Sequence, residues 1–324
     1  MRTNRPIVGI DLGGTNMQIG VVDGANKVIG RAKRKTKAAE GQRKVLDRIV
    51  EGVQEACHNA GVAARSIAAV GIGAPGAIDP ATGTVREAPN LRWNDVPLGR
   101  LLTRRLNKPV LVDNDVNVAV FGEHRLGAGR GASDLLGVWI GTGVGGGLIF
   151  HNRLYHGFTF TAGEIGHTVL FPGAPPGSRK VEENCSRTAV VDRILRLIRS
   201  NHPSMVLELA EGDPEAVKAK TVSIAYQKGD RLTRQVVDNA AHLLGISIAN
   251  VVTLLGIPRV VLGGGLTEAL GETLVALVRD SVRQHVFPEV CRRVEVVGTR
   301  LDADAGVLGA ALLARERLGV RSRA

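Results

Sequence analysis

The chain has 324 residues, of which 44% are hydrophobic and 23% charged, a balance that predicts packed globular domains rather than a disordered chain. Its net charge is +11, but aromatic residues make up only 3% and the basic residues are spread out, so we interpret the charge as a solvated basic surface rather than a nucleic-acid-binding site. Three scattered cysteines, together with the lack of any apolar run of about 20 residues, exclude a disulfide framework and a membrane span and indicate a cytoplasmic protein.

The first predicted strand, 7–10, leads into a glycine-rich turn that reads Asp-Leu-Gly-Gly-Thr-Asn over residues 11–16. Predicted strands at 19–22 and 28–30 then continue in antiparallel order. Such a turn exposes successive N–H groups that can bind phosphate oxygens, and an aspartate at a strand end can hold Mg²⁺ through water. An ordinary β-turn is the alternative, because the turn has neither the Walker A spacing nor the G-x-G-x-x-G pattern.

A polar stretch interrupts an apolar segment at residues 113–117. It follows a predicted amphipathic helix at 42–60, a strand at 67–72, a Gly/Pro loop with an irregular stretch up to Trp93, and a short helix at 98–107. Asp113, Asn114, Asp115 and Asn117 stand where a buried strand, 109–112, ends and a helix begins. Ligands bind at the carboxyl ends of strands in α/β folds, although Asp and Asn are also common helix N-caps.

The second half of the chain repeats the strand, glycine turn and strand of the first. A strand at 135–140 leads into the glycines of 141–147 and a strand at 148–150, about 130 residues after the first turn, which predicts two similar lobes. Further predicted elements are a helix containing Val190 and Ile198, peripheral helix over 201–220, a long buried helix at 232–255, a strand at 259–262 ending in Gly263–Gly265, a helix from 266, a strand at 294–297 and a helix at 303–318.

Nine motifs in this order resemble the ROK family of sugar kinases and sugar-responsive repressors, within the actin-like ATPase superfamily. They are Asp11-Leu-Gly-Gly-Thr15, Gly73-Ala-Pro-Gly76, Asn90-Leu-x-Trp93, Asn114-Asp115, Gly127-Ala-Gly-Arg-Gly131, Gly141-Thr-Gly-Val-Gly145, Gly163-Glu-x-Gly-His167, Gly263-Gly-Gly265 and Asp304-Ala-Gly306. The resemblance runs from Ile7 to about Ala314.

The resemblance implies a two-lobed α/β fold of the actin-like ATPase, or ribonuclease H-like, type, in which each lobe is a mixed sheet flanked by helices. It implies a small N-terminal lobe, 1–118, which a C-terminal helix at 303–324 rejoins, and a larger lobe, 119–302. It also implies ATP and Mg²⁺ as cofactors, with Asp11 on the Mg²⁺ side. The phosphate and adenosine positions would be Gly13, Gly14, Thr15, Gly141, Thr142, Gly143, Gly263, Gly264 and Gly265.

The resemblance further implies that Asp115 is the general base on the sugar hydroxyl. The other sugar-binding candidates are Gly76, Asn90, Asn114, Glu164, His167 and Glu182. Alone, His167 would be interpreted as a satisfied core histidine, and the choice of Glu182 over Glu183 rests on its spacing to Ser186. Pyranose hydroxyls require such paired acceptors and donors, because an unpaired buried polar group costs about 1–3 kcal/mol.

One departure from the family is large. The family follows the Gly-Glu-x-Gly-His segment with a cysteine-rich zinc site, whereas this chain has no cysteine between His167 and Glu182. Structural zinc needs four N or S ligands, and only His167 remains, so we predict no zinc. Other contacts must then hold the loop at 171–181.

The leading hypothesis is an ATP-dependent kinase that phosphorylates glucose at its 6-hydroxyl. The alternatives are a kinase for N-acetylmannosamine, fructose, mannose or allose, a glucokinase that uses polyphosphate, and a non-catalytic sugar-sensing regulator. We expect no regulator, because only six residues precede the first strand and leave no room for a helix-turn-helix domain. The expected partners are a sugar and a nucleotide, without nucleic acid or membrane, and the resemblance suggests a homodimer or homotetramer.

Overall fold

The computed structural model describes residues 5–319, which form two compact units. The first unit contains 5–130, 154–162 and 303–319, and the second contains 131–153 and 163–302. The predicted boundary after residue 118 thus differs from the observed one, because all of α3 (Asp115–Leu126) packs within the first unit, against α11 (Ala305–Arg317). The predicted helical residues 320–324, including a short basic tail, lie outside the described residues.

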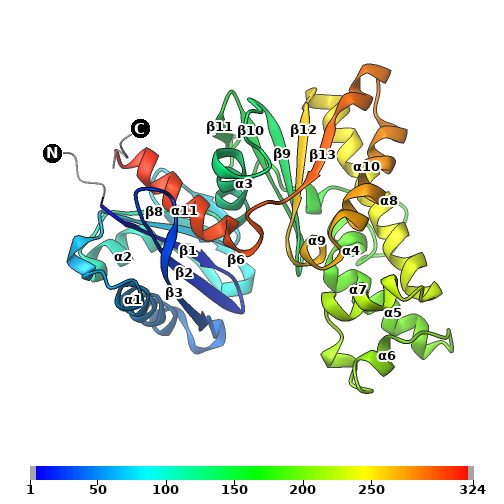
Figure 1. The fold of residues 1–324 in the computed structure, drawn as a ribbon, viewed down its shortest axis with the longest axis horizontal. Coiled ribbons are helices and arrows are strands. Elements are labelled where there is room, and N and C mark those ends of the chain that lie inside the picture. Colours follow the sequence, from blue (N-terminus) through cyan, green and yellow to red (C-terminus); the bar gives the residue numbers. More distant parts are fainter. Residues whose placement is uncertain (1–4, 320–324) are drawn as a thin grey trace. The chain divides into compact units, whose positions relative to one another are not determined.

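The first unit is built on a five-stranded sheet in which β4 is parallel to both of its neighbours and β2 is antiparallel to both of its own (Figure 1). The strands, in spatial order, are β3 (Val28–Lys35), β2 (Asn16–Val22), β1 (Ile7–Leu12), β4 (Val70–Ala74) and β8 (Val110–Asn114). Because β1, β4 and β8 are parallel, Asp11 pairs with Gly73, and Gly73 pairs with Asp113. The polar ends of these strands therefore share one edge of the sheet.

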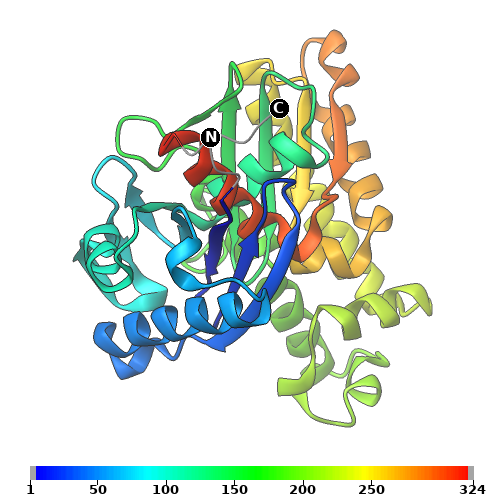
Figure 2. The ribbon, with the colours of Figure 1, turned by 60° about the vertical axis from the view of Figure 1, so that its left-hand side comes forward.

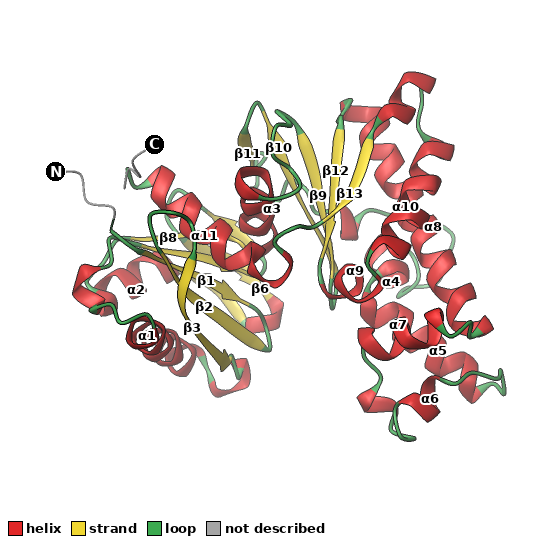
Figure 3. Ribbon diagram, viewed as in Figure 1, coloured by secondary structure: helices red, strands yellow, loops and turns green. Residues whose placement is uncertain are grey.

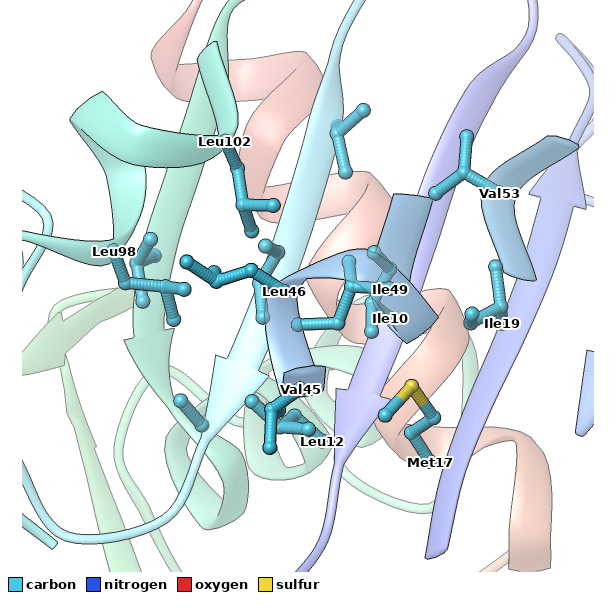
Figure 4. Close-up of a cluster of buried hydrophobic side chains, with 14 of the residues drawn as sticks. Ile10, Leu12, Met17, Ile19, Val45, Leu46, Ile49, Val53, Leu98 and Leu102 are labelled. Atoms are coloured by element: carbon cyan, nitrogen blue, oxygen red, sulfur yellow. The ribbon is translucent and has the colours of Figure 1, made fainter. Parts of the chain in front are cut away.

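Helices α1 (Gln42–Asn59) and α2 (Leu98–Leu106) cover one face of this sheet. Figure 4 shows apolar side chains of both helices in one cluster with those of the sheet, among them Leu46, Ile49 and Leu102 together with Ile10 and Ile19. All of these side chains are at most 2% exposed, so the predicted 3.6-residue apolar period of 42–60 does face the core.

Helix α11 packs at very close range on the other face, where Figure 2 shows it in red crossing the dark-blue strands. A Cβ on Gly9 would lie 1.9 Å from Val307 O, and one on Gly309 would lie 1.7 Å from Val118 O. No side chain fits at such distances, so backbone packs directly on backbone. The glycines therefore allow the last helix to pack against β1, β4 and α3.

A second, three-stranded antiparallel sheet of the first unit occupies a region that the sequence analysis described as an irregular loop. Its strands are β5 (Ala77–Asp79), β6 (Thr84–Ala88) and β7 (Trp93–Val96). Each strand has three to five residues, too short for a clear alternating pattern, and the buried Ile78, Val85 and Trp93 hold the sheet on the core.

The second unit repeats the strand plan of the first, which confirms the predicted duplication. The sheet has the order β11 (Arg153–Tyr155), β10 (Val144–Phe150), β9 (Leu135–Ile140), β12 (Arg259–Gly263) and β13 (Glu295–Gly298). Strand β11 stands where the chain leaves this unit, so only its first residue, Arg153, is counted in the second unit. As with the corresponding strands of the first unit, β10 is antiparallel to β9, and β12 is parallel to β9 and to β13.

Helices lie beside the second sheet, as Figure 3 shows in red beside yellow strands, and some of them pack on its strands while the others pack on those helices. They are α4 (Val181–Cys185), α5 (Arg187–Arg199), α6 (Val206–Leu209), α7 (Ala219–Gln227), α8 (Arg231–Leu255), α9 (Gly265–Leu270) and α10 (Glu272–His285). The prediction of helix over 201–220 is wrong for most of that range, because Pro203, Gly212 and Pro214 leave only the four-residue α6, a short 3₁₀ turn and the start of α7. That 3₁₀ turn is Pro214–Ala216, and further ones lie at Ala38–Glu40, Ala64–Ser66, Pro89–Leu91, Ile165–His167, Glu289–Arg293 and Asp302–Asp304.

Among the described residues, α8 is long and apolar enough to cross a membrane by length and composition, which the sequence analysis did not anticipate. More than half of its apolar window, 56%, is buried inside the protein, and α8 packs against α10, α4 and α5. Packing in the core of the second unit accounts for its apolar composition.

We predict that Gly309→Ala lowers the stability of the protein, because the new methyl group would overlap the Val118 carbonyl oxygen. Overpacking of this kind typically costs about 1–3 kcal/mol, and each kcal/mol lowers the melting temperature by roughly 2–4 °C in a domain of this size. Gly173→Ala is the matched control, since nothing lies within 4 Å of its Cβ position. Equal melting temperatures of the two variants would contradict the close packing of α11.

Candidate active site

The carboxyl ends of β4 and β8 bring Gly76 and Asn114 together. Asn114 is the N-cap of α3: its side-chain oxygen accepts hydrogen bonds from Val116 N at 2.9 Å and Asn117 N at 3.1 Å. Its amide nitrogen donates to Gly76 O at 3.1 Å. The helix-cap interpretation of the polar stretch is therefore correct for Asn114, and the same bonds attach the β4–β5 loop to the start of α3.

Asp115 is the first residue of α3, and its carboxylate accepts a hydrogen bond from Val116 N at 2.9 Å. Burial raises the pKa of this carboxyl above its ordinary value of 3.8, and the hydrogen bond from Val116 N opposes part of that rise. A Cβ on Gly73 would lie 3.0 Å from Asp115 Cα, so a glycine at the end of β4 makes room for this residue. The result is a carboxylate of increased basicity at the edge of the sheet.

Asp11, at the end of β1, is the second carboxylate of this edge. Burial, and to a smaller extent the nearby Asp115 carboxylate, together raise its pKa to about 7. A Cβ on Gly306 would lie 2.8 Å from Asp11 Cγ, so the start of α11 packs directly against it. Two repelling carboxylates at the edge of the sheet form an oxygen donor set that suits Mg²⁺.

The glycine turn between β1 and β2 is held by a residue that the sequence analysis did not identify. The buried Thr36 donates from its hydroxyl to Gly13 O at 2.6 Å and from its backbone N to Thr15 O at 2.8 Å. A Cβ on Gly14 would lie 3.1 Å from that of Asn90, so Asn90 lies beside the turn. Thr15 itself is exposed.

His156 is a second residue that sequence reasoning missed. Its Nε2 lies 2.8 Å from Asp113 Oδ2, and Asp113 Oδ1 accepts from the backbone N of Asn114 and from Asn117 Nδ2. Both side chains are largely buried, with 12% and 2% of their surface exposed. The bond attaches segment 154–162 to the polar stretch of β8. No local sequence pattern signals it, because the partners lie 43 residues apart.

In the second unit, two side chains hold the glycine turn between β9 and β10. Glu182 Oε2 accepts a hydrogen bond from Val144 N at 2.9 Å, and a Cβ on Gly143 would lie only 2.1 Å from that oxygen. From α5, Arg187 donates through its backbone N to Gly141 O at 3.0 Å and through its guanidinium to Thr142 Oγ1 at 2.9 Å. The turn thus has a carboxylate and a guanidinium beside it.

The neighbouring glutamate has a different environment. Glu183 accepts hydrogen bonds from the backbone N of Arg179 and of Lys180, at the start of α4, whereas Glu182 points to the glycine turn.

Glu164 precedes a 3₁₀ turn and His167 ends it, with 3.9 Å between Glu164 Oε2 and His167 Nε2, and the His167 side chain is 57% exposed. His167 is therefore not a buried core histidine.

The three glycines after β12 differ in what they contact. A Cβ on Gly263 would lie 2.5 Å from the Trp139 ring, and one on Gly264 would lie 2.7 Å from Ile140 N. Gly265 has open space, with nothing within 4 Å of its Cβ position. Close packing against β9 therefore explains why Gly263 and Gly264 are glycines. Of the three, only Gly265 has free space beside it that a ligand could occupy.

The residues around the loop at 168–181 do not fit a structural zinc ion. Within residues 5–319, no three His, Cys, Asp or Glu side chains are grouped so as to hold a metal. Cys185, three residues past Glu182, is buried, and the loop itself contributes no cysteine ligand.

Comparison with known proteins places these observations in one family. A model of the ROK family matches residues 7–317. The chain is 35% identical to a glucokinase of Thermotoga maritima over 97% of this chain and 98% of that protein. It resembles the crystal structure of a ROK family glucokinase from Streptomyces griseus in complex with glucose and AMPPNP, with a TM-score of 0.86, 31% identity and coverage of 96% and 99%. It also resembles a ROK hexokinase from Thermus thermophilus, with a TM-score of 0.77, 30% identity and coverage of 97% and 99%.

These similarities confirm the predicted fold class, a two-lobed actin-like ATPase fold with a mixed sheet and flanking helices in each lobe. They confirm the predicted family as well.

We predict that Asp11→Asn stabilises the protein without ligands at neutral pH. Because the pKa of Asp11 is raised to about 7 in the folded chain, its ionisation lowers folded stability from about pH 4 upward, and the full cost is present above pH 7. With allowance for solvent contact, we expect a gain on the order of 1–2 kcal/mol at pH 8 that disappears near pH 4.

Thermal melts in EDTA across this pH range measure the effect. Asp280→Asn, which changes an exposed aspartate of α10, is the control. A variant less stable than the wild type at pH 8 would contradict the raised pKa.

Proposed function

The chain belongs to the ROK family, and from this premise and the geometry of β8 we propose that it transfers the γ-phosphoryl group of ATP to the 6-hydroxyl of glucose. The observation that carries the proposal is the position of Asp115: a carboxylate of raised pKa at the end of a parallel strand, in a chain similar to a glucose-bound ROK glucokinase. We propose Asp115 as the general base.

In the proposed reaction, the glucose 6-oxygen attacks the γ-phosphorus while the bond from that phosphorus to the β–γ bridging oxygen breaks. Asp115 accepts the proton of the hydroxyl, and ADP leaves with the bond's electrons. A carboxylate with a raised pKa is a better proton acceptor than an ordinary one, and general-base catalysis contributes typically about 10²–10⁴-fold.

Positioning and charge neutralisation provide the rest of the rate enhancement in phosphoryl transfer. We propose that the backbone N–H groups of Gly13–Thr15 and Gly141–Gly143 face the phosphates, and that Gly263–Gly265, chiefly Gly265, borders the adenosine. Asp11 would hold Mg²⁺ through water; the bound ion neutralises charge on the phosphate oxygens. Burial and, to a smaller extent, repulsion by Asp115 raise the pKa of Asp11, and a bound Mg²⁺ would favour the ionised carboxylate.

The sugar hydroxyls need donors and acceptors that are already oriented. We propose Asn114, Glu164 and His167 for this role, together with Glu182 through the oxygen that does not accept from Val144 N. Gly76, which accepts from Asn114, and Asn90, beside the first turn, would line the edge of the sugar site. Glu183 is a poor candidate, because its carboxylate caps α4.

Other members of the predicted set of substrates remain alternatives for the same machinery: N-acetylmannosamine, fructose, mannose or allose as acceptor, and polyphosphate as donor. The similarity to relatives described as glucokinases favours glucose and ATP. We also propose a cytoplasmic enzyme that forms a homodimer or homotetramer, which light scattering of the purified protein would measure.

We predict that Asp115→Asn lowers kcat for glucose by at least about 100-fold, because asparagine cannot accept the proton. Glucose binding, measured by calorimetry, is expected to stay within a few-fold of the wild type, since the side chain keeps its shape. Asp280→Asn, at an exposed position, serves as control. A wild type that turns over none of the hexoses with Mg·ATP would contradict the proposed function.

We predict further that kcat/KM for glucose falls tenfold per pH unit on the acid side, because Asp115 must be ionised to act. Since burial raises the pKa of Asp115, this fall begins at a less acidic pH than for an ordinary carboxyl. Saturating Mg·ATP keeps Asp11 ionised during the measurement. A rate that stays level down to about pH 4 would exclude Asp115 as the base.

A further inference from the structure

The loop between His167 and Glu182 is closed by backbone hydrogen bonds between its two ends. Val181 N donates to Thr168 O at 3.0 Å, Leu170 N donates to Arg179 O at 2.8 Å, and Val169 and Lys180 form an antiparallel bridge. The first of these bonds joins the residue after His167 to the residue before Glu182. The loop therefore determines how far apart these two sugar-binding candidates lie.

Two side chains of α4 brace the second arm of this loop. Glu183 Oε2 accepts from Arg179 N at 2.6 Å and from Lys180 N at 2.9 Å, and Asn184 Nδ2 donates to Ser178 O at 3.0 Å and to Lys180 O at 2.8 Å. Four hydrogen bonds from two adjacent residues thus fix the backbone at 178–180. We call Glu183, Asn184 and the backbone that they bind the α4 clamp.

The charge on Glu183 favours this arrangement. The hydrogen bond from Lys180 N is the largest cause that lowers the pKa of the Glu183 carboxyl below its usual value, and the bond from Arg179 N acts in the same direction. The carboxylate is therefore ionised at neutral pH, where it accepts stronger hydrogen bonds than a neutral group and lies in the first turn of a helix.

The sequence alone does not show which contacts hold the loop between His167 and Glu182 in place, and the α4 clamp supplies such contacts. The family resemblance implies a metal at this loop, whereas no three His, Cys, Asp or Glu side chains of residues 5–319 are grouped so as to hold one, and the loop still begins at His167 and ends at Glu182. We propose that Glu183 and Asn184 are positioning residues that close the 168–181 loop by hydrogen bonds in place of a metal ion and so orient His167 and Glu182 toward the sugar. This inference rests on the proposed function for its last step only.

Hydrogen exchange measured by mass spectrometry tests the α4 clamp without any assay of activity. In Glu183→Ala and in Asn184→Ala, we expect the amides of 168–181 to exchange at least about tenfold faster than in the wild type. Glu183→Gln keeps an acceptor oxygen and is expected to retain most of the protection. Glu208→Ala is the matched control, because Glu208 also lies in the first turn of a short helix and is exposed.

Steady-state kinetics tests the positioning role. We expect KM for glucose to rise at least about fivefold in Glu183→Ala, with rescue in Glu183→Gln and no change in Glu208→Ala. Unchanged KM in a variant whose loop exchanges faster would overturn the positioning role. If the wild type turns over no sugar, the exchange result still decides whether the α4 clamp holds the loop.

A separate measurement tests whether the 168–181 loop binds zinc. We expect purified protein to contain no stoichiometric zinc by elemental analysis, and a zinc-selective chelator in the presence of Mg²⁺ to leave the exchange of 168–181 unchanged. One zinc ion per chain whose removal speeds exchange of the loop would overturn the proposal. So would unchanged exchange in both alanine variants.

Discussion

The first unit depends on the direct contact between the backbone of α11 and the backbones of β1, β4 and α3. Gly9, Gly71 and Gly309 leave no room for a single methyl group, so the contact has essentially one geometry. Because α11 is the last helix of the described residues, it joins the C-terminal part of the chain to the strands that the N-terminal residues form. The same contact packs Gly306 against Asp11, so the packing of the helix and the position of a site carboxylate are linked.

The two units use one strand plan to present different chemistry. In the first, β1 carries Asp11 near its end and Asp115 directly follows β8, and burial raises the pKa values of both carboxylates. In the second, the corresponding strand β9 ends in a glycine turn held by Glu182 and Arg187. Both units contribute a proposed phosphate turn, but the proposed base and Mg²⁺ residues belong to the first unit alone, which follows from these side chains and not from the shared topology.

The two buried carboxylates at the edge of the first sheet, Asp11 and Asp115, suit the proposed function but lower the stability of the folded chain. A buried carboxylate with a raised pKa is less favourable in the folded chain than in the unfolded one. Asn114 and Asp113 offset this cost locally: the first caps α3, and the second joins His156 and Asn117 into one hydrogen-bonded group. The polar stretch 113–117 is thus both a helix cap and the proposed catalytic segment.

Much of the fold could be predicted from sequence, because long apolar periods such as those of 42–60 and 232–255 do not depend on distant residues. The strands of 77–96 and the four-residue α6 within the largely irregular stretch 201–218 could not, since short elements carry too few residues for a period. For the site, the glycine turns and the polar stretch had local signals. The bonds of His156 to Asp113 and of Thr36 to Gly13 had none, because only the folded chain brings these residues together. The pair Glu182 and Glu183 shows the same limit: adjacent identical residues differ only in what the fold places beside each.

The central claim is that Asp115 accepts the proton of the sugar's 6-hydroxyl. A crystal structure of the protein with glucose and AMPPNP tests it most directly. The account predicts a hydrogen bond of about 2.5–3.0 Å between an Asp115 carboxylate oxygen and the glucose 6-oxygen, with that oxygen facing the γ-phosphorus. A 6-hydroxyl that faces the γ-phosphorus but is bonded to another residue, with Asp115 out of reach, would contradict it.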